Sequence, residues 1–356
     1  MREFSYEPAE GDLNHREVLK AWGIILSGRE PALSIELTKE CPLACPGCYA
    51  FQPDHLDGVP LKSLSDFRDE ALITGVVDLV AKHRPLVLYF VGGEPLVRFR
   101  ELTAILPKVC AQTVETYVVT SAVRRLPLEW AELENLRIVV SIDGLQPEHD
   151  ARRKPATYER ILKNIEGHRI KIHCTVTSQM MTRDDYLEEF MTFWGNRPEI
   201  ESIQVSFYTP QIGETSIEML TPEMRRRAAA ELGRLHESFP KIRVNPAILE
   251  AFLSPPSSPS ECVFARVTKT VSADLTTLVT PCQLGGNPDC SQCGCLGSMG
   301  LHAVSNYRLP LGIRIRSIFN ASDAIGRSVR RARQAAKQLS IRPAPAPPLS
   351  PKRRST

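Results

Sequence analysis

Strand-like and helix-like segments alternate six times between residues 33 and 208, which predicts an α/β fold with parallel strands and helices outside them. Six such units suit a partial (βα)6 barrel of the TIM type. Unusual polar residues and cysteines follow the ends of these strands, where the chemistry of such barrels is found. Five further cysteines gather at residues 262–295 and predict a small cysteine-rich C-terminal domain.

The individual elements follow from hydrophobic periodicity and from residues that start or stop helices. Strands are expected at 33–37, 86–91, 115–120, 137–141, 171–177 and 200–208. Helices are expected at about 65–82 with Ser65 as the N-cap, at 157–165 with Gly167 as the stop, and at 183–194. Residues 214–252 look helical, and residues 267–280 resemble a hairpin with its turn at 273–274.

These elements divide the chain into five parts. Residues 1–31 form a lead-in with one helix at about 15–26, and residues 32–213 form the barrel core. Residues 214–312 hold a helical linker and the cysteine-rich domain, and residues 313–340 form a basic helix. Residues 341–356 are rich in proline and arginine and are expected to be a disordered tail.

Composition limits the class of protein. The chain has 356 residues and 42% apolar residues, enough for a sizeable core. It has no apolar run near the ~18–20 residues that span a membrane, and its first residues lack a signal-peptide core. Ten cysteines without an export signal indicate a cytoplasmic protein whose thiols serve metals or catalysis. Cys110 and Cys174 stand alone and are expected in the core.

Charge is distributed unevenly. Residues 301–356 carry twelve Lys or Arg and one acid, whereas residues 1–300 carry a net charge of −8. The basic end could bind an anionic membrane surface or an acidic partner, and a solvated end is the simpler interpretation. No nucleic-acid partner is expected.

Three cysteines with the spacing C-x3-C-x2-C follow the first strand. Cys41, Cys45 and Cys48 could hold three corners of an iron–sulfur cluster, which usually takes four cysteines. The next cysteine is distant, so one iron could stay open for a small molecule. A zinc site with His55 as the fourth ligand, or three unlinked cysteines, are the alternatives.

Polar residues also follow the other strands. Gly92, Gly93 and Glu94 come directly after the second strand, where glycines permit close backbone approach and a carboxylate can accept from an ammonium group. An ordinary turn with a solvated Glu is the alternative. The remaining strand ends carry Thr120-Ser121, Ser141 with Asp143, Thr177-Ser178 and Tyr208-Thr209.

Together these motifs resemble the radical SAM enzymes. In that family the cysteine triplet binds a [4Fe–4S] cluster whose open iron is chelated by S-adenosylmethionine. By this resemblance Glu94, within Gly92-Gly93-Glu94-Pro95, binds the amine of the cofactor's methionine. Ser141-x-Asp143-Gly144 followed by His149-Asp150-x-x-Arg153 is a further match, and implies that Ser141 and Arg153 contact the cofactor, Arg153 through its carboxylate. A plain turn and a surface arginine are the alternative for this segment.

The resemblance covers about residues 34–209, and one motif departs from it. Many relatives have Thr-Asn-Gly at the end of the third strand, whereas this chain has Thr120-Ser121-Ala122. We therefore assign no cofactor ligand there. The sequence names no catalytic acid or base.

The C-terminal cysteines resemble the twitch or SPASM-type auxiliary-cluster regions of radical SAM maturases. Cys262, Cys282, Cys290 and Cys293 are the first choice of ligands for a second [4Fe–4S] cluster, and Cys295 could replace one of them. Their spacing is more compressed than the usual pattern. A structural zinc knuckle is the alternative, with His302 as a conceivable ligand.

The resemblance implies an enzyme that reductively cleaves S-adenosylmethionine and uses the 5′-deoxyadenosyl radical to abstract hydrogen from a peptide, a protein or a small molecule. Its electron donor would be a flavodoxin or a ferredoxin. One alternative is a radical SAM enzyme acting on a lipid or a membrane-associated metabolite. Another is a zinc-binding α/β protein without catalytic activity.

Overall fold

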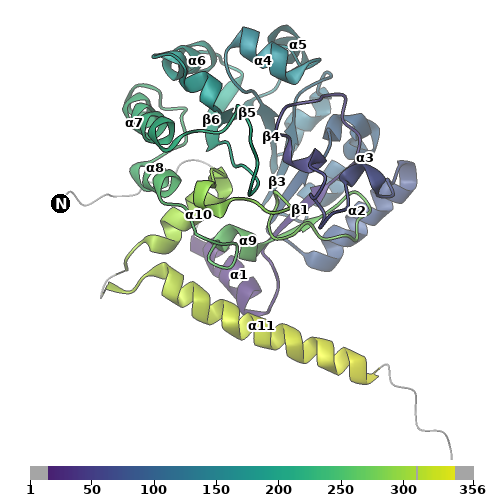
Figure 1. Ribbon diagram of the computed structural model, residues 1–356. Coiled ribbons are helices and arrows are strands. Elements are labelled where there is room, and N and C mark those ends of the chain that lie inside the picture. The colour runs from purple at the N-terminus through teal and green to yellow at the C-terminus, as the bar shows by residue number, and fades with distance from the viewer. Residues whose placement is uncertain (1–14, 310–311, 341–356) are drawn as a thin grey trace, which may run out of the picture. The chain divides into compact units, whose positions relative to one another are not determined.

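The computed structural model describes residues 15–309 and 312–340 of the chain. It divides into two compact units, of which the larger is Glu30–Ile318 and contains the sheet and all ten cysteines (Figure 1). The described part of the smaller unit consists of residues 15–29 and 319–340. The predicted disordered tail at 341–356 lies outside the described residues.

Seven parallel strands form the sheet of the larger unit, in the order β6-β5-β4-β3-β2-β1-β7. The strands are β1 (Ala32–Glu36), β2 (Val87–Val91), β3 (Glu115–Thr120), β4 (Leu136–Ser141), β5 (Ile170–Val176), β6 (Ile200–Phe207) and β7 (Thr268–Val271). The predicted partial α/β barrel is confirmed, and the six predicted strands end within one residue of their predicted positions.

Helices accompany the strands along the chain. They are α2 (Asp69–His83), α3 (Phe99–Cys110), α4 (Gln146–Arg153), α5 (Tyr158–Asn164), α6 (Tyr186–Gly195), α7 (Pro222–Ser238), α8 (Pro246–Leu253), α9 (Val263–Val267) and α10 (Leu296–Asn306). Short 3₁₀ turns are η1 (Tyr49–Phe51), η2 (Leu61–Ser63), η3 (Pro95–Arg98), η4 (Leu128–Glu132), η5 (Ser178–Met181) and η6 (Cys290–Gln292).

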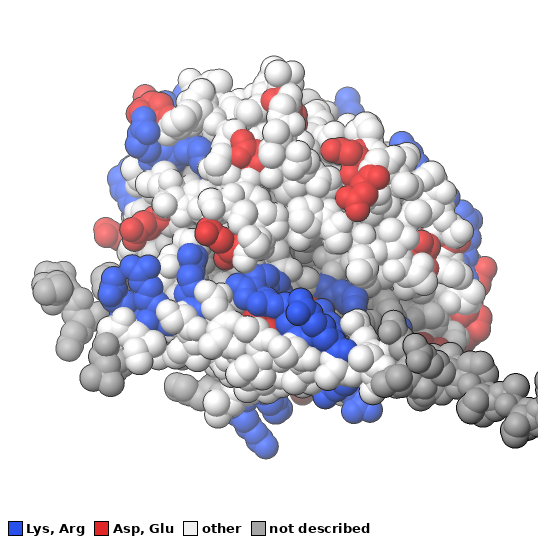
Figure 2. Space-filling model, turned by 60° about the horizontal axis from the view of Figure 1, so that its bottom comes forward, with Lys and Arg blue, Asp and Glu red and all other residues white. Residues whose placement is uncertain are grey.

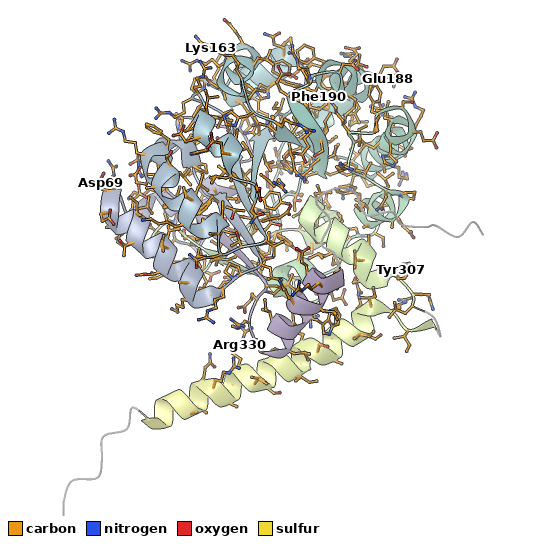
Figure 3. The ribbon with its side chains drawn as sticks, turned by 180° about the vertical axis from the view of Figure 1, so that it is seen from behind. Asp69, Lys163, Glu188, Phe190, Tyr307 and Arg330 are labelled. Atoms are coloured by element: carbon orange, nitrogen blue, oxygen red, sulfur yellow. The ribbon has the colours of Figure 1, made fainter. Side chains whose placement is uncertain are left out.

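The main core lies between the sheet and these helices. Alternate residues of β1, Leu33 and Ile35, belong to the same buried cluster as Leu72 of α2 and Phe190 of α6 (Figure 3). Side chains of a strand alternate between its two faces, so the polar Glu36 points to the opposite, inner face. The inner face of the barrel is therefore free to carry polar groups.

The helix predicted from Ser65 begins four residues later, at Asp69, and its N-cap position is Arg68 (Figure 3). Tertiary contacts hold the preceding segment instead: Asp66 accepts from Arg98 at 2.5 Å and from the Thr38 hydroxyl at 3.2 Å. The helix α5 agrees better with its prediction.

Thr157 is the N-cap of α5, and its hydroxyl accepts from the Arg160 backbone N–H at 3.4 Å. Gly167 follows the helix with a positive φ of 85°, a conformation that favours glycine. The region 214–252 predicted as helical contains α7 and α8.

The hairpin predicted at 267–280 corresponds to β7, its turn and a single antiparallel bridge between Val271 and Leu278. Asp274 closes the turn, because its Oδ1 accepts from the backbone N–H groups of Thr276 and Thr277. The first strand of this hairpin, β7, also pairs in parallel with β1, which was not predicted, and it thereby adds a seventh strand to the sheet. This pairing joins the cysteine-rich segment to the barrel.

The smaller unit pairs α1 (His15–Leu26) with most of α11 (Ile315–Ser340), so both predicted helices are present. The Trp22 indole N–H donates to the Ser322 hydroxyl at 3.0 Å, and Arg330 donates through Nε to the Gly28 carbonyl at 2.8 Å (Figure 3). A Cβ at Gly326 would lie 2.1 Å from the Ile25 carbonyl oxygen, so the glycine permits this close approach.

No helix within the described residues is both long enough and apolar enough to cross a membrane.

Candidate active site

The cysteine triplet lies on the loop between β1 and η1. Cys41, Cys45 and Cys48 are each partly exposed, and the Leu43 backbone N–H donates to Cys41 Sγ at 3.4 Å. Burial raises the pKa of Cys41 to about 12, and the charges of Cys45 and Cys48 add to that rise. Metal binding would displace the thiol protons. The positive charge of the metal would also reduce the electrostatic repulsion between the three thiolates.

The two glycines after β2 pack against the start of this loop. The backbone N–H of Gly93 donates to the Thr38 carbonyl at 2.9 Å, and that of Glu94 donates to the Glu40 carbonyl at 2.8 Å. A Cβ at Gly93 would lie 2.1 Å from the Glu40 carbonyl oxygen, and Gly92 has a φ of +113°. These glycines therefore fix the loop of the cysteines against the end of β2.

Glu94 itself is fully buried beyond β2. Its carboxylate accepts from the Thr120 hydroxyl, from the Ser121 backbone N–H at 2.8 Å and from the Leu96 backbone N–H at 3.0 Å. Burial raises the pKa of Glu94, and these hydrogen bonds oppose the rise. Thr120 and Ser121 thus hold the Glu94 carboxylate, although their departure from the family motif left them without an assigned role. Their position at the end of the third strand had already placed them among the polar residues of that rim.

Arg153, the last residue of α4, connects the motifs. It donates through Nε to Asp143 Oδ2 at 2.7 Å, and its Nη1 lies 3.4 Å from Ser121 Oγ and 4.0 Å from Cys45 Sγ. Burial alone would raise the pKa of Asp143, but the positive charges of Arg153 and Arg152 hold it well below its usual range. The cysteine loop, the end of β3 and the segment after β4 therefore converge.

Ser141 ends β4 directly opposite His173 of β5 in the strand register. His173 Nε2 lies 2.8 Å from Ser206 Oγ, and this oxygen also accepts from the Leu296 backbone N–H at 3.1 Å. Burial lowers the pKa of His173. Neither periodicity nor a motif indicated His173 or Ser206, because single polar residues within strands form no such pattern.

The five C-terminal cysteines line one small cavity, together with Ser298 and Phe264. These cysteines are Cys262, Cys282, Cys290, Cys293 and Cys295. Burial raises the pKa of Cys282 to about 12 and that of Cys290 to about 11, and the charges of neighbouring cysteines contribute to both rises. Ser298 Oγ lies 3.1 Å from Cys262 Sγ. The structure thus brings all five thiols together. His302, the other conceivable ligand, contacts Arg316 through Nδ1 at 3.0 Å.

Within the described residues, no group of three or more His, Cys, Asp or Glu side chains has the arrangement of a metal-ion site. A cubane cluster is wider than one ion and separates its thiolates accordingly. His55, the conceivable fourth zinc ligand, is buried with Nε2 at 2.6 Å from Glu36 Oε1 and Nδ1 at 3.1 Å from the Leu284 carbonyl oxygen. Both ring nitrogens are therefore engaged by protein groups.

The sequence profile of the radical SAM superfamily matches residues 35–193, the segment that carries the cysteine triplet, Glu94 and Arg153. Over this segment the chain is similar to the radical SAM superfamily. The donor set fits the family's cofactors: three thiols stand beside one guanidinium and one buried carboxylate, groups suited to an iron–sulfur cluster and to an amino acid's charged ends.

Two curated relatives are similar to part of this chain. One is the probable GTP 3′,8-cyclase of Methanosarcina acetivorans, 27% identical over 52% of this chain and 58% of the relative. The other is the PqqA peptide cyclase of Granulibacter bethesdensis, 34% identical over 34% of this chain and 30% of the relative. The matches thus span less than two thirds of either relative.

A solved structure described as native anSMEcpe with bound AdoMet has the same fold. It superposes with a TM-score of 0.51 at 16% identity, covering 68% of this chain and 72% of the other. A His-tagged form of the same protein gives a TM-score of 0.50 at 18% identity.

Proposed function

We propose that the protein is a radical SAM enzyme in which Cys41, Cys45 and Cys48 hold a [4Fe–4S] cluster that binds S-adenosylmethionine. The observation that carries the proposal is the convergence of Arg153 on both Cys45 Sγ, at 4.0 Å, and Ser121, whose backbone holds Glu94. When bound and reduced, the cluster and its cofactor supply a 5′-deoxyadenosyl radical that abstracts hydrogen from an unactivated carbon.

The chain's own residues bind and orient the cofactor in this proposal. Glu94 would accept from the methionine ammonium, and Arg153 would donate to the methionine carboxylate, a planar pairing that suits a guanidinium. Gly92 and Gly93 hold the cysteine loop in register with both groups, and Ser141 is a further contact. Asp143 keeps the Arg153 guanidinium oriented through the 2.7 Å bond from Nε.

The substrate is a peptide, a protein or a small molecule. The names of the two curated relatives support both classes, since one is a peptide cyclase and the other a GTP cyclase. His173 lies on β5, whose Thr175 backbone N–H donates to Asp143, and Ser206 lies on the neighbouring strand β6. Both would present polar groups to the substrate from the barrel interior. A flavodoxin or a ferredoxin would deliver the electron.

The C-terminal cysteines would hold a second [4Fe–4S] cluster, in a region of the twitch or SPASM type. The shared cavity of Cys262, Cys282, Cys290, Cys293 and Cys295 supports this proposal. Four of the five thiols suffice as ligands. A zinc ion bound by four of the same thiols is the competing assignment.

The basic C-terminus would attach the enzyme to an anionic membrane surface. Exposed arginines of α11 such as Arg327, Arg331 and Arg333 support this, as do the exposed apolar side chains of Ile318 and Ile325. Figure 2 shows Lys and Arg side chains at the surface in the view that it presents.

Iron and sulfide analysis after anaerobic reconstitution tests the proposed cofactors. We expect about eight irons and eight sulfides per chain, and about four of each when Cys41, Cys45 and Cys48 are all changed to Ala. A variant that holds one zinc and no iron would establish the zinc assignment for the C-terminal cysteines. A wild-type protein that binds no iron would overturn the proposed function.

A further inference from the structure

The two groups of cysteines are joined by a buried side chain, His55. It follows the cysteine triplet on the same connection and is fully buried. Its Nε2 lies 2.6 Å from Oε1 of Glu36, the last residue of β1, and its Nδ1 lies 3.1 Å from the carbonyl oxygen of Leu284. Leu284 is two residues beyond Cys282, so one imidazole contacts both cysteine-bearing segments.

The backbone strengthens the same connection. The Gly286 backbone N–H donates to the His55 carbonyl at 3.1 Å. A Cβ at Gly285, which has a φ of +65°, would lie 2.3 Å from the His55 carbonyl oxygen and 2.4 Å from its Nδ1. The segment after Cys282 therefore lies directly against His55, with no room for a side chain between them.

Glu36 extends the network to the edge strand. Its Oε2 accepts from the hydroxyl of Ser272 at 2.6 Å, and Ser272 directly follows β7, the strand that leads into the C-terminal cysteines. On the other side, the Tyr49 ring lies 5.8 Å from the His55 ring and directly follows Cys48.

The hydrogen bonding of the imidazole is directional. A carbonyl can only accept, so Nδ1 must donate to Leu284, and the short Nε2–Oε1 contact then needs one proton on either partner. Every polar atom of the His55–Glu36 pair is engaged, and these groups are buried. Removing one partner would leave a buried group unsatisfied, which costs much more than losing a bond in water.

We propose that His55 is a positioning residue that couples the two metal centres: a filled C-terminal site orders the segment at Leu284, and His55 transmits that order to the loop of Cys41, Cys45 and Cys48. The coupling rests on the proposed function, since it requires metal at both groups of cysteines. It predicts that the N-terminal cluster is held less firmly when the C-terminal site is empty.

A double-mutant cycle tests the coupling in the full-length, reconstituted protein. The four proteins are the wild type, His55→Ala, the pair Cys282→Ala with Cys290→Ala, and all three changes together. The measurement is the loss rate, in excess iron chelator, of the reduced-cluster EPR signal that responds to added S-adenosylmethionine. This signal follows the N-terminal cluster alone.

We expect the cysteine pair of changes to accelerate this loss at least fivefold in the wild-type background. In the His55→Ala background they should change it less than twofold. If His55 were only a packing residue, its replacement would accelerate loss by the same factor in both backgrounds, and the two effects would multiply. Multiplying effects, or no acceleration by the cysteine changes, would overturn the coupling.

Matched variants keep the result interpretable. His168→Ala removes another buried histidine, 4% exposed, which lies against the backbone of Leu126 and Pro127. This change should leave the coupling unchanged. Glu36→Gln keeps the size of the Glu36 side chain and serves in the cycle if His55→Ala does not fold. In the Glu36→Gln background, the cysteine changes should again alter the loss rate less than twofold. A wild type without any cofactor-responsive signal would refute the proposed function, whereas a normal signal with multiplying effects would refute only the coupling.

Discussion

The Arg153 guanidinium has several partners in a space from which water is largely excluded. It binds Asp143, contacts Ser121 and lies near Cys45, and its side chain is 15% exposed. A guanidinium can serve these partners at once because its donors lie in one rigid plane. A lysine would keep the charge and lose the paired geometry.

Arg153→Lys should therefore weaken S-adenosylmethionine binding about tenfold or more, which corresponds to roughly 1.4 kcal/mol or more. Iron content should not change, because no cysteine is altered. Equilibrium binding of the cofactor to the reconstituted protein measures the effect. Arg125→Lys, at an exposed ion pair with Glu166, is the control and should bind like the wild type. Equal affinities in all three proteins would remove Arg153 from the binding site.

His149 makes stability depend on pH. It is fully buried, its Nδ1 accepts from the Asp143 backbone N–H at 3.1 Å, and its Nε2 lies 2.8 Å from the Ala156 carbonyl oxygen. Burial lowers its pKa from 6.5 to about 4. The unfolded chain therefore takes up the proton first as the pH falls, so this contribution is complete above about pH 6.5 and is lost towards pH 4.

The free energy of unfolding should fall by up to about 3 kcal/mol between these pH values because of His149. Urea unfolding of the wild type and of His149→Gln across this range measures the difference in slope. The variant should lose less stability on acidification than the wild type, whatever its stability at neutral pH. Parallel curves for the two proteins would exclude this role of His149.

At the scale of elements, close backbone packing links the end of β2 to the cysteine loop. Gly93→Ala would place a Cβ 2.1 Å from the Glu40 carbonyl, so the backbone must move. Gly300 lies in α10 with no atom near its would-be Cβ, and Ala there is a better helix former by about 1 kcal/mol.

We therefore expect Gly93→Ala to destabilise the protein by at least about 2 kcal/mol and to lower the retention of the N-terminal cluster. Gly300→Ala should be neutral or slightly stabilising. Thermal unfolding and iron analysis of the two variants make the comparison. A Gly93→Ala protein with normal melting and full iron would show that the loop tolerates the shift.

The elements also show how far the sequence was informative. Strands with continuous or alternating apolar residues, such as β3 at Glu115–Thr120, were predicted to the residue. The start of α2 was misplaced because Asp66 is bound by Arg98, a partner 32 residues away that no local pattern reveals. The pairing of β7 with β1 was missed for the same reason, since a hairpin pattern does not say which other strand lies beside it.

The site was predictable where a motif marked it. The cysteine triplet, Glu94 and Arg153 stand in dense local patterns, and the fold brings them together. Thr120 and Ser121 were recognised as polar residues at a strand end, but no motif indicated that they hold Glu94. His173 and Ser206 are ordinary polar residues within strands, and only the parallel register brings them together. His55 was considered as a metal ligand, whereas its ring nitrogens face Glu36 and Leu284.

At the scale of the whole molecule, residues 319–340 of the basic C-terminus belong to a different unit from the ten cysteines. Arg330 and Arg333 donate to backbone carbonyls at the end of α1, so the helix up to this point belongs to the folded smaller unit. A deletion of residues 341–356 removes Arg342, Lys352, Arg353 and Arg354 and leaves these contacts intact.

This deletion should leave iron content and melting temperature unchanged. Binding to vesicles of phosphatidylcholine with phosphatidylglycerol should weaken at least tenfold at low salt, since each basic residue near an acidic bilayer contributes roughly 1 kcal/mol. Sedimentation with vesicles measures this, and pure phosphatidylcholine vesicles are the control. Equal binding before and after deletion would mean that the tail does not attach the enzyme to membranes.

The proposed activity depends most directly on the three cysteines after β1. The decisive measurement is the 5′-deoxyadenosine formed from S-adenosylmethionine by the anaerobically reconstituted, dithionite-reduced protein, compared with variants in which Cys41, Cys45 or Cys48 is changed to Ala. We predict 5′-deoxyadenosine from the wild type and from Cys110→Ala, whose thiol is buried in the core, and none above background from the three loop variants. Formation at the wild-type rate in any loop variant, or none from the wild type with its iron in place, would contradict the account.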